Sequence, residues 1–286
     1  MHETPDGTSP PPENSRDLLG RMRRRHAWAT LDLGPLWVPR MAPQPPGDES
    51  ASSTSPEGLP VQPASGEISM PAPEAFPSGG EVTADAPDMP AAQRWIQLRQ
   101  DVAECQRCRL ASTRTHTVFG RGASRHARWL LIGEAPGAEE DRQGEAFVGQ
   151  AGKLLDAMLD AAGINPDADV FIANVLKCRP PDNRDPQADE VAACTDFLHA
   201  QIRLVHPDCI LLLGRFAAQS VLHSDLQIGR LRNKVHHITL DGRSVPVVVT
   251  YHPAYLLRNP KDKIKSWEDL CLALSAVAGA GTPEPG

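Results

Sequence analysis

Short apolar segments alternate with amphipathic ones over most of the chain, and this alternation constrains the fold more than any other feature. The segments 128–133, 169–175 and 209–214 are apolar runs of strand length, each followed by residues at helical spacing. A fourth apolar run, 245–252, is the second arm of a hairpin that turns at Asp241–Gly242. Strands that alternate with helices form mostly parallel sheets with helices on both faces. The sequence therefore predicts an α/β fold, a three-layer α/β/α sandwich with a central, mostly parallel four-stranded sheet.

The N-terminal third differs in composition from the rest of the chain. Residues 1–92 hold 17 of the 28 prolines, together with much Ser, Gly and Glu. Such a segment buries too little apolar surface to offset its ordering entropy, so we expect a disordered tail over 1–90 and a folded domain over 91–280. Within the tail, residues 16–39 are either a residual hydrophobic patch or a peptide that binds an unidentified protein partner. A secretory signal and a membrane span are both unexpected, which favours a cytoplasmic protein.

The cysteines fall into two groups. Two of the six lie inside apolar runs and are typical of buried small hydrophobes. The other four form one C-x-x-C pair and two separated positions, namely Cys105, Cys108, Cys178 and Cys194. Structural disulfides are unexpected in a protein without a secretory signal. Four such thiolates suit Zn²⁺ or an iron–sulfur cluster, and their spacing leaves zinc, iron–sulfur and no metal all open.

Three loops with unusual composition follow predicted strands: 133–150, 174–184 and 251–260. Ligands of α/β sheets bind at the carboxyl ends of the strands, so the chemistry of these loops should converge on one site. The first loop is Gly-rich and acidic, and Phe147 lies in its polar half. Each residue also has a structural explanation, since Asn174 and His252 could be hydrogen-bonded strand-end residues and Phe147 a core residue. Their shared edge of the sheet favours a functional explanation.

Three motifs resemble a known family. The segments GEAPGAEEDRQGEAFVG (133–149), NVLKCRPP (174–181) and YHPAYLLR (251–258), with the four spaced cysteines, resemble the family 4 uracil-DNA glycosylases. Those are iron–sulfur members of the uracil-DNA glycosylase superfamily. The resemblance runs from about Ala92 to Ala276. It implies a DNA repair hydrolase that flips uracil out of DNA and hydrolyses its N-glycosidic bond, leaving an abasic site.

The resemblance also implies roles for single residues. Asn174 would read O4 and N3 of uracil, and Phe147 would stack on the base. Glu140 would lie beside C5, where the methyl group of thymine would collide. His252 would donate a hydrogen bond to O2 as negative charge grows on the ring. The implied uracil-binding residues are Glu134, Ala135, Glu140, Phe147, Asn174 and His252, with Glu134 and His252 catalytic.

The acids of the first loop would face the sugar, which gains positive charge as the bond breaks. Glu134 is the matching carboxylate. The best-known branch of the superfamily has an aspartate one position later, where this chain has Ala135. The attacking water would then be held by Glu134, by backbone groups or by another residue.

The remaining implied contacts are with DNA and with a metal cluster. The last loop would enter the minor groove, where apolar wedges are common. The implied DNA contacts are Leu256 or Leu257 as the wedge, with Arg179, Arg184 and Arg258 on phosphates. The resemblance favours a structural [4Fe–4S] cluster, held by Cys105, Cys108, Cys178 and Cys194. The expected partner is uracil-containing DNA, single- or double-stranded, bound by a monomeric, nucleoid-associated protein.

Other functions stay open at this point. A related glycosylase could prefer another deaminated base, such as hypoxanthine, or trap DNA covalently. A zinc- or iron-bearing DNA-binding module without activity is a non-enzyme alternative. The net charge of −7 does not exclude DNA, because phosphate contacts need only one local basic face. A phosphate-binding α/β enzyme is disfavoured, because the Gly-rich loop lacks the lysine that such loops use.

Overall fold

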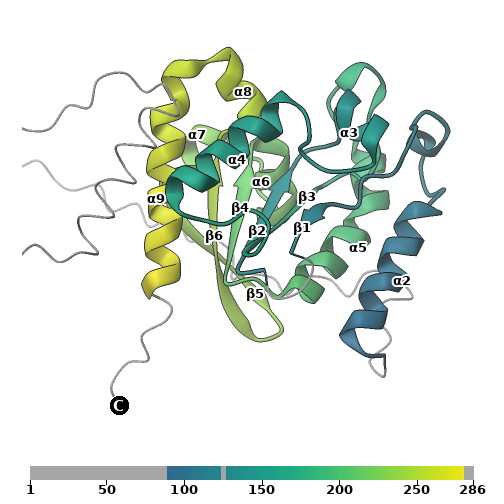
Figure 1. Ribbon diagram of the computed structural model, residues 1–286, viewed down its shortest axis with the longest axis horizontal. Helices are drawn as coiled ribbons and strands as arrows, with labels where there is room; N and C mark the ends of the chain where they lie inside the picture. The colour runs from purple at the N-terminus through teal and green to yellow at the C-terminus, as the bar shows by residue number, and fades with distance from the viewer. Residues whose placement is uncertain (1–88, 124–126, 280–286) are drawn as a thin grey trace, which may run out of the picture.

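A six-stranded sheet forms the centre of the molecule in the computed structural model, which describes residues 89–123 and 127–279 (Figure 1). In spatial order the strands are β1 (Arg121–Gly122), β3 (Val170–Asn174), β2 (Trp129–Gly133), β4 (Cys209–Leu213), β6 (Arg243–Thr250) and β5 (Val235–Leu240). The four middle strands are parallel, and β1 and β5 pair antiparallel at the two edges. The predicted α/β fold and its parallel core are confirmed, and the sheet is wider than the four predicted strands.

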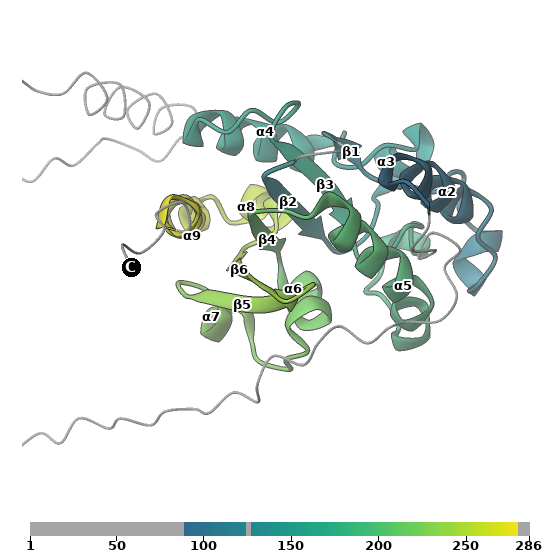
Figure 2. The ribbon, with the colours of Figure 1, turned by 90° about the horizontal axis from the view of Figure 1, so that it is seen from below.

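Helices cover both faces of the sheet (Figure 2). One face packs against α2 (Ala91–Ala103), α5 (Ala188–Val205), α6 (Arg215–Leu222) and α7 (Ile228–Leu231). The other face packs against α4 (Gln150–Ala162), α8 (Pro253–Arg258) and α9 (Lys263–Gly279). Shorter elements are α3 (Ala138–Gln143), η2 (Arg109–Ser112), η3 (Pro181–Asn183) and η4 (Pro260–Asp262). The predicted three layers are therefore present.

The two cores follow from the alternation of side chains along each strand. In β2, Leu130 and Ile132 belong to the core on the α5 side, whereas Trp129 and Leu131 belong to the core on the α9 side. All five residues of β2 are buried. A parallel strand buried on both faces must be almost continuously apolar, which is why the strand segments were recognisable in the sequence.

Two turns form as their sequences predict. Asp241 and Gly242 connect β5 to β6 with φ of 49° and 77°, the left-handed geometry that tight hairpins require. Gly163 ends α4 with φ of 73°. The edge strand β1 was not predicted, because two residues provide no readable period.

The register of the parallel strands brings the loops of interest together. Gly133 at the end of β2 pairs with Asn174 at the end of β3, and Leu213 of β4 pairs with Thr250 of β6. The loops that follow these four residues therefore leave the same edge of the sheet.

None of the helices in residues 89–123 and 127–279 is long and apolar enough to cross a membrane. Residues 1–88 of the predicted tail, including its 16–39 segment, lie outside the described residues.

Candidate active site

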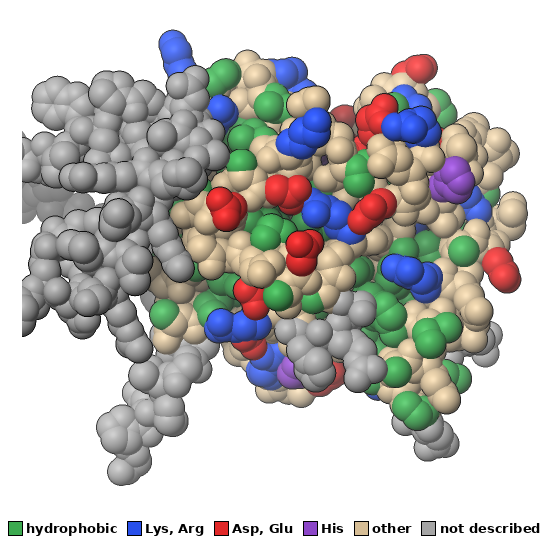
Figure 3. Space-filling model, in the orientation of Figure 1, with side chains coloured by type: hydrophobic (Ala, Val, Ile, Leu, Met, Phe, Trp, Pro, Cys, Tyr) green, Lys and Arg blue, Asp and Glu red, His purple; other side chains and the backbone are tan. Residues whose placement is uncertain are grey.

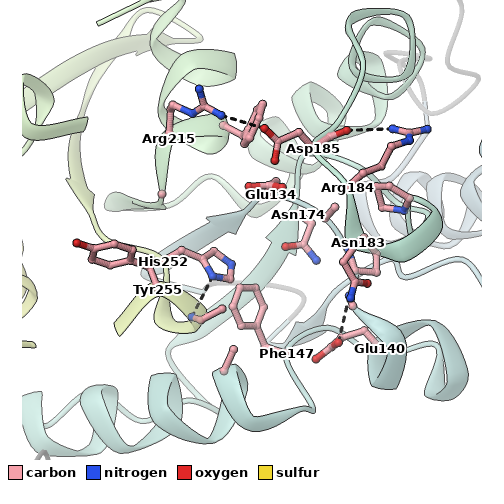
Figure 4. A pocket seen from close by; sticks show the side chains of 18 of the residues that line it. Glu134, Glu140, Phe147, Asn174, Asn183, Arg184, Asp185, Arg215, His252 and Tyr255 are labelled. Atoms are coloured by element: carbon pink, nitrogen blue, oxygen red, sulfur yellow. Dashed lines mark hydrogen bonds and ion pairs between the residues drawn. The ribbon is translucent and has the colours of Figure 1, made fainter. Parts of the chain in front are cut away.

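A pocket of about 620 Å³ opens at the carboxyl ends of β2, β3, β4 and β6. Its lining comes from the three predicted loops and from a fourth, which follows β4. Figure 4 shows that the side chains of Asn174, Phe147 and His252 point toward one another across this pocket. The sequence-based prediction that these loops converge is therefore correct as a statement of geometry.

Asn174 is the most deeply buried polar group of the pocket. Its side chain is 2% exposed, and its Oδ1 atom has no hydrogen-bond partner in the structure. Gly133 provides the space, because a Cβ there would lie 2.4 Å from Oδ1 of Asn174 and 2.7 Å from Cζ of Phe147. Buried polar groups are nearly always paired, so this oxygen is a candidate acceptor for an N–H of a molecule in the pocket.

Phe147 forms one wall of the pocket in a strained backbone conformation. Its φ is 52°, a value that aromatic residues rarely adopt, and its side chain is 5% exposed. Its ring centroid lies 5.6 Å from that of His252, with the rings tilted by 33°. Its carbonyl packs tightly on Gly152 of α4, where a Cβ would lie 1.6 Å from the Phe147 oxygen. Strain of this kind persists where the surroundings enforce it, as at many functional sites.

His252 is held as a neutral hydrogen-bond donor. Its Nδ1 accepts a hydrogen bond from the backbone N–H of Ala254 at 3.1 Å, so the proton of the neutral ring is on Nε2. Burial, with a smaller contribution from Arg258, lowers the pKa of His252 to about 4. Gly214 gives the ring room, because a Cβ there would lie 3.1 Å from Cβ of His252.

Glu134 lies on the opposite side of the pocket from Phe147 (Figure 4). Burial and, to a smaller extent, the carboxylate of Asp185 raise the pKa of Glu134 to about 7, against the opposing charge of Arg215. Asp185 and Arg215 form an ion pair at 3.1 Å. The sequence reasoning missed both residues. Arg215 directly follows the β4 segment, so the strand-end rule that selected the other loops would have found it.

Glu140 organises the first loop from within. Its carboxylate accepts hydrogen bonds from the backbone N–H of Gly137 at 3.1 Å and of Gly149 at 2.9 Å. The two ends of the loop are thereby joined, and Glu140 still lines the pocket. Ala135 also lines the pocket and packs against a small cluster of buried cysteines.

The two leucines predicted as a wedge differ sharply in exposure. Leu256 is 0% exposed and belongs to the core on the α9 side, whereas Leu257 is 44% exposed. Only Leu257 is therefore free to reach another molecule without unpacking the protein. Arg258 beside it is exposed and lines the pocket rim.

The other two predicted phosphate contacts have partners inside the protein. Arg184 forms two hydrogen bonds with the buried carboxylate of Glu190, at 2.9 and 2.6 Å. Arg179 donates to the side chain of Asn183 at 2.8 Å. Both residues therefore have a structural role within the loop that precedes α5. Basic and acidic side chains are interspersed over the face shown in Figure 3.

The four cysteines of the predicted cluster lie near one another. Cys178 and Cys194 are buried and share an apolar cluster against which Cys108 packs. Arg114 donates to Sγ of Cys178 at 3.2 Å and to the carbonyl of Cys105 at 2.7 Å. All four are free thiols, and burial raises the pKa of Cys194 to about 11.

The cysteine arrangement does not suit a single metal ion. Within the described ranges, no group of three or more His, Cys, Asp or Glu side chains could hold one ion. Tetrahedral zinc would need sulfur atoms about 3.8 Å apart, from Zn–S bonds of about 2.3 Å. A polynuclear cluster spreads its thiolates over several metal atoms, so it does not require four sulfur atoms around one ion.

Comparison with known proteins identifies the family of this chain. The uracil DNA glycosylase superfamily model matches residues 119–271, which include the three motif loops. The type-4 uracil-DNA glycosylase of Archaeoglobus fulgidus is 45% identical over 166 residues, covering 57% of this chain and 82% of the relative. That of Thermotoga maritima is 42% identical over 188 residues, covering 64% and 95%. The type-5 uracil-DNA glycosylase of Pyrobaculum aerophilum is 30% identical over 146 residues, covering 46% and 63%. The chain therefore belongs to the uracil DNA glycosylase superfamily and, within it, to the type-4 uracil-DNA glycosylases.

Proposed function

We propose that this protein is a DNA repair glycosylase that flips uracil out of DNA and hydrolyses its N-glycosidic bond, leaving an abasic site. The observation that carries the proposal is the unpaired amide of Asn174, which faces a pocket lined by Phe147 and His252 in a type-4 chain. A flipped base needs a flat apolar surface and a polar edge that matches its own. The pocket supplies both.

Asn174 is proposed to read the base. Uracil presents an acceptor at O4 and a donor at N3, which one amide side chain can satisfy together. Cytosine presents the reverse pattern at these two positions, so it would leave the buried amide mispaired. The unpaired Oδ1 of Asn174 would accept from N3–H, and Phe147 would stack on the base. Glu140, through its bonds to Gly137 and Gly149, would hold the loop that faces C5.

His252 is proposed to stabilise the departing uracil. As the N-glycosidic bond breaks, negative charge collects on the ring and its O2 atom. The Nε2–H of a neutral imidazole can donate to O2, and this bond strengthens as the charge grows. The lowered pKa of His252, about 4, keeps the ring neutral at physiological pH. His252 therefore acts as a hydrogen-bond donor rather than as a proton donor.

Glu134 is proposed to act on the sugar. The anomeric carbon gains positive charge as uracil leaves, and an ionised carboxylate nearby stabilises that charge. The same carboxylate would also orient the attacking water. Ala135, at the position of the aspartate in the best-known branch, has no polar side chain for that role. With a pKa of about 7, Glu134 is only partly ionised at neutral pH.

The DNA contacts are proposed to come from α8 and from the loop before α5. Leu257 would enter the space that the flipped base leaves, because Leu256 is committed to the core. Arg258 would contact phosphates. Arg179 and Arg184 would contact phosphates only through the guanidinium N–H groups that do not bond to Asn183 and Glu190.

Cys105, Cys108, Cys178 and Cys194 are proposed to hold a [4Fe–4S] cluster. All four are free thiols, and Cys178 and Cys194 bracket a loop that borders the pocket. When bound, the cluster would join the segment between α2 and η2, which carries Cys105 and Cys108, to the loop after β3 through Cys178 and to α5 through Cys194. Its role would be structural. Replacing Cys178 with Ala should abolish visible absorbance near 400 nm, whereas replacing the buried Cys209 should not. Zinc without iron in anaerobically purified protein would overturn this assignment.

The domain is proposed to extend over residues 91–280 and to act as a monomer within the nucleoid. Residues 1–90 would be a separate tail that uracil excision does not require. A protein that starts at residue 88 should excise uracil as fast as the full chain. A large loss of activity on that truncation would assign part of the tail to the enzyme.

An excision assay tests the function directly. Anaerobically purified protein is incubated with labelled oligonucleotides that contain one uracil, one hypoxanthine or one cytosine, as single strands and as duplexes, and then treated with alkali. Strand cleavage at uracil, slowed about 10²–10³-fold in a His252→Ala protein, supports the proposal. Cleavage only at hypoxanthine would identify a related glycosylase. DNA binding without cleavage at any base would identify a non-catalytic module.

A further inference from the structure

Arg215 is a pocket arginine with a surface ion pair. It lines the pocket, its side chain is 51% exposed, and its guanidinium bonds to the carboxylate of Asp185 at 3.1 Å. Asp185, on the loop before α5, is itself 72% exposed. Surface ion pairs contribute little to stability, so the guanidinium can exchange Asp185 for another anion at small cost. Arg184, by contrast, is held by the buried carboxylate of Glu190.

The chain around Arg215 holds its guanidinium at the pocket. Gly214 precedes α6 with φ of 98°, a left-handed value that favours glycine, and Arg215 is the first residue of the helix. The guanidinium lies over the ring of Phe216, 4.4 Å from its centroid, and Phe216 also lines the pocket. An arginine stacked on an aromatic ring still offers its N–H groups at the edges of the guanidinium plane. The stacking contact therefore does not depend on Asp185.

The ion pair lies where the backbone of a bound nucleotide would pass. Figure 4 shows Arg215 and Asp185 on the Glu134 side of the pocket, away from Phe147. With the base stacked on Phe147 and the sugar facing Glu134, the phosphates joined to that sugar would reach the same side as the ion pair. Arginine binds phosphate through two parallel N–H···O bonds, whereas the carboxylate of Asp185 would repel it.

We propose that Arg215 binds a phosphate of the flipped nucleotide and exchanges its bond to Asp185 for bonds to the DNA backbone. The inference rests on the proposed function, because it needs a uracil nucleotide in the pocket. Asp185 holds the guanidinium while the pocket is empty. Together with Arg258 of α8, Arg215 gives the pocket two arginines from separate elements, and the sugar of the flipped nucleotide is joined to two phosphates.

The salt dependence of DNA binding tests the phosphate contact. Dissociation constants of anaerobically purified full chains are measured from about 50 to about 200 mM salt. The probe is a duplex with one 2′-fluoro-2′-deoxyuridine, whose fluorine slows loss of the base. Arg215→Gln should bind about tenfold more weakly, and the slope of log Kd against log salt should fall by about 0.9. Arg215→Lys keeps the charge and should keep the slope.

Arg128→Gln is the matched control. Arg128 forms an ion pair with Asp208 at the same distance, 3.1 Å, and with similar exposure, 56% and 45%. It directly precedes β2, whereas Arg215 follows β4, so it lies at the opposite edge of the sheet from the pocket. Arg128→Gln should therefore change neither the affinity nor the slope.

A neutral phosphate locates the contact on the DNA. A methylphosphonate placed 5′ or 3′ of the uridine removes one backbone charge. Wild-type protein should lose about tenfold in affinity at one of these two positions, and Arg215→Gln should lose less than about twofold there. Asp185→Asn removes the competing carboxylate and should bind the unmodified duplex several-fold more tightly.

The possible outcomes separate the inference from the proposed function. An unchanged salt slope in Arg215→Gln would overturn the inference, as would equal losses by wild type and Arg215→Gln at both methylphosphonates. A wild-type protein that excises no uracil would instead overturn the proposed function. If Arg215→Gln does not fold, Asp185→Asn decides. Tighter binding that disappears with one methylphosphonate supports the inference, and unchanged or weaker binding overturns it.

Discussion

The pocket and the cysteine loop, which we define as residues 178–194 and which includes the first turns of α5 and part of the pocket wall, differ in how their buried polar groups are paired. In the pocket, the amide oxygen of Asn174 has no partner, and Glu134 has its pKa raised to about 7 by burial. In the cysteine loop, Glu190 is 0% exposed and bonds to Arg184, to Arg109 and to the backbone N–H of Gln187. These bonds, led by Arg184, lower the pKa of Glu190 to about 2.

This difference in hydrogen bonding distinguishes polar groups that are available to a ligand from polar groups that stabilise the folded protein. Unpaired or strained groups cost stability, and the pocket has both an unpaired Asn174 and a strained Phe147. The cysteine loop has the opposite character, because its buried carboxylate is fully hydrogen-bonded. Changes in the pocket should therefore affect catalysis more than folding, and changes in the cysteine loop should affect folding more than catalysis.

The largest effect is expected at His252. Replacing it with Ala removes the donor that faces the charge growing on uracil, so the single-turnover rate should fall by about 10²–10³-fold. DNA binding should change little, and loss of the hydrogen bond from Ala254 that caps α8 should cost about 0.5–2 kcal/mol of stability. His236, whose Nε2 contacts the Leu231 carbonyl outside the pocket, is the matched control, and His236→Ala should keep the wild-type rate. Equal losses of single-turnover rate in both variants would contradict a special role for the pocket histidine.

The ionisation of Glu134 should control the pH dependence of the reaction. Its pKa is raised to about 7, so the carboxylate form is scarce at pH 5 and half-populated at pH 7. If the carboxylate is the active form, the single-turnover rate should rise about 50-fold between pH 5 and pH 7 and level off above pH 8. His252, with a pKa of about 4, stays neutral over this range. Glu134→Gln should be slow and nearly independent of pH, and a sloping profile in that variant would assign the titration elsewhere.

A stability effect is expected in the cysteine loop. Glu190→Gln removes the carboxylate that Arg184 and Arg109 share, and should lower the free energy of unfolding by about 1–3 kcal/mol. The folded-state pKa of Glu190 is lowered from 4.5 to about 2, so its stabilisation is fully present above pH 4.5. It should be lost as the pH falls from 4.5 toward 2, and the variant should lack this loss. Denaturant titrations across that pH range measure the loss of stability. A large drop in the excision rate of Glu190→Gln with an unchanged free energy of unfolding would contradict a structural role for Glu190.

The smallest effect is expected at Leu257. Because its side chain is exposed, Leu257→Ala should leave stability unchanged and slow excision from duplex DNA by several-fold, with single strands unaffected. Leu256→Ala, one residue earlier, should instead cost about 2–5 kcal/mol of stability through a core cavity. Thermal melts and excision rates on duplex and single-stranded DNA distinguish the two variants. A loss of duplex excision without a loss of stability in Leu256→Ala would instead make Leu256 the wedge.

The sequence predicted most of the fold and the convergence of the loops, for identifiable reasons. Strands such as 209–213 are buried on both faces, so their composition alone marks them. Asn174, Phe147 and His252 were selected because they follow strands, and the register of a parallel sheet places strand ends together. The family resemblance added their roles, which the register alone does not provide.

What could not be predicted depends on tertiary contacts. Leu256 and Leu257 are adjacent in a six-residue helix, too short for a period to show which one faces the core. Arg184 has no evident partner in the sequence, yet its carboxylate partner, Glu190, lies in the first turn of α5. The ion pair of Arg215 with Asp185 joins loops 30 residues apart, and sequence spacing contains no signal for it.

One comparison of excision rates tests the central claim, that the unpaired amide of Asn174 selects the base. Single-turnover excision is measured for wild type, Asn174→Asp and Phe147→Ala on matched duplexes with one uracil or one cytosine. Asn174→Asp should lose about one to two orders of magnitude on uracil and gain slightly on cytosine, from a mispaired buried edge of about 1–3 kcal/mol. Phe147→Ala should lose a similar amount on uracil, about 1–3 kcal/mol of stacking, with its base choice unchanged. A wild-type uracil rate in Asn174→Asp would contradict the claim that this amide reads the base.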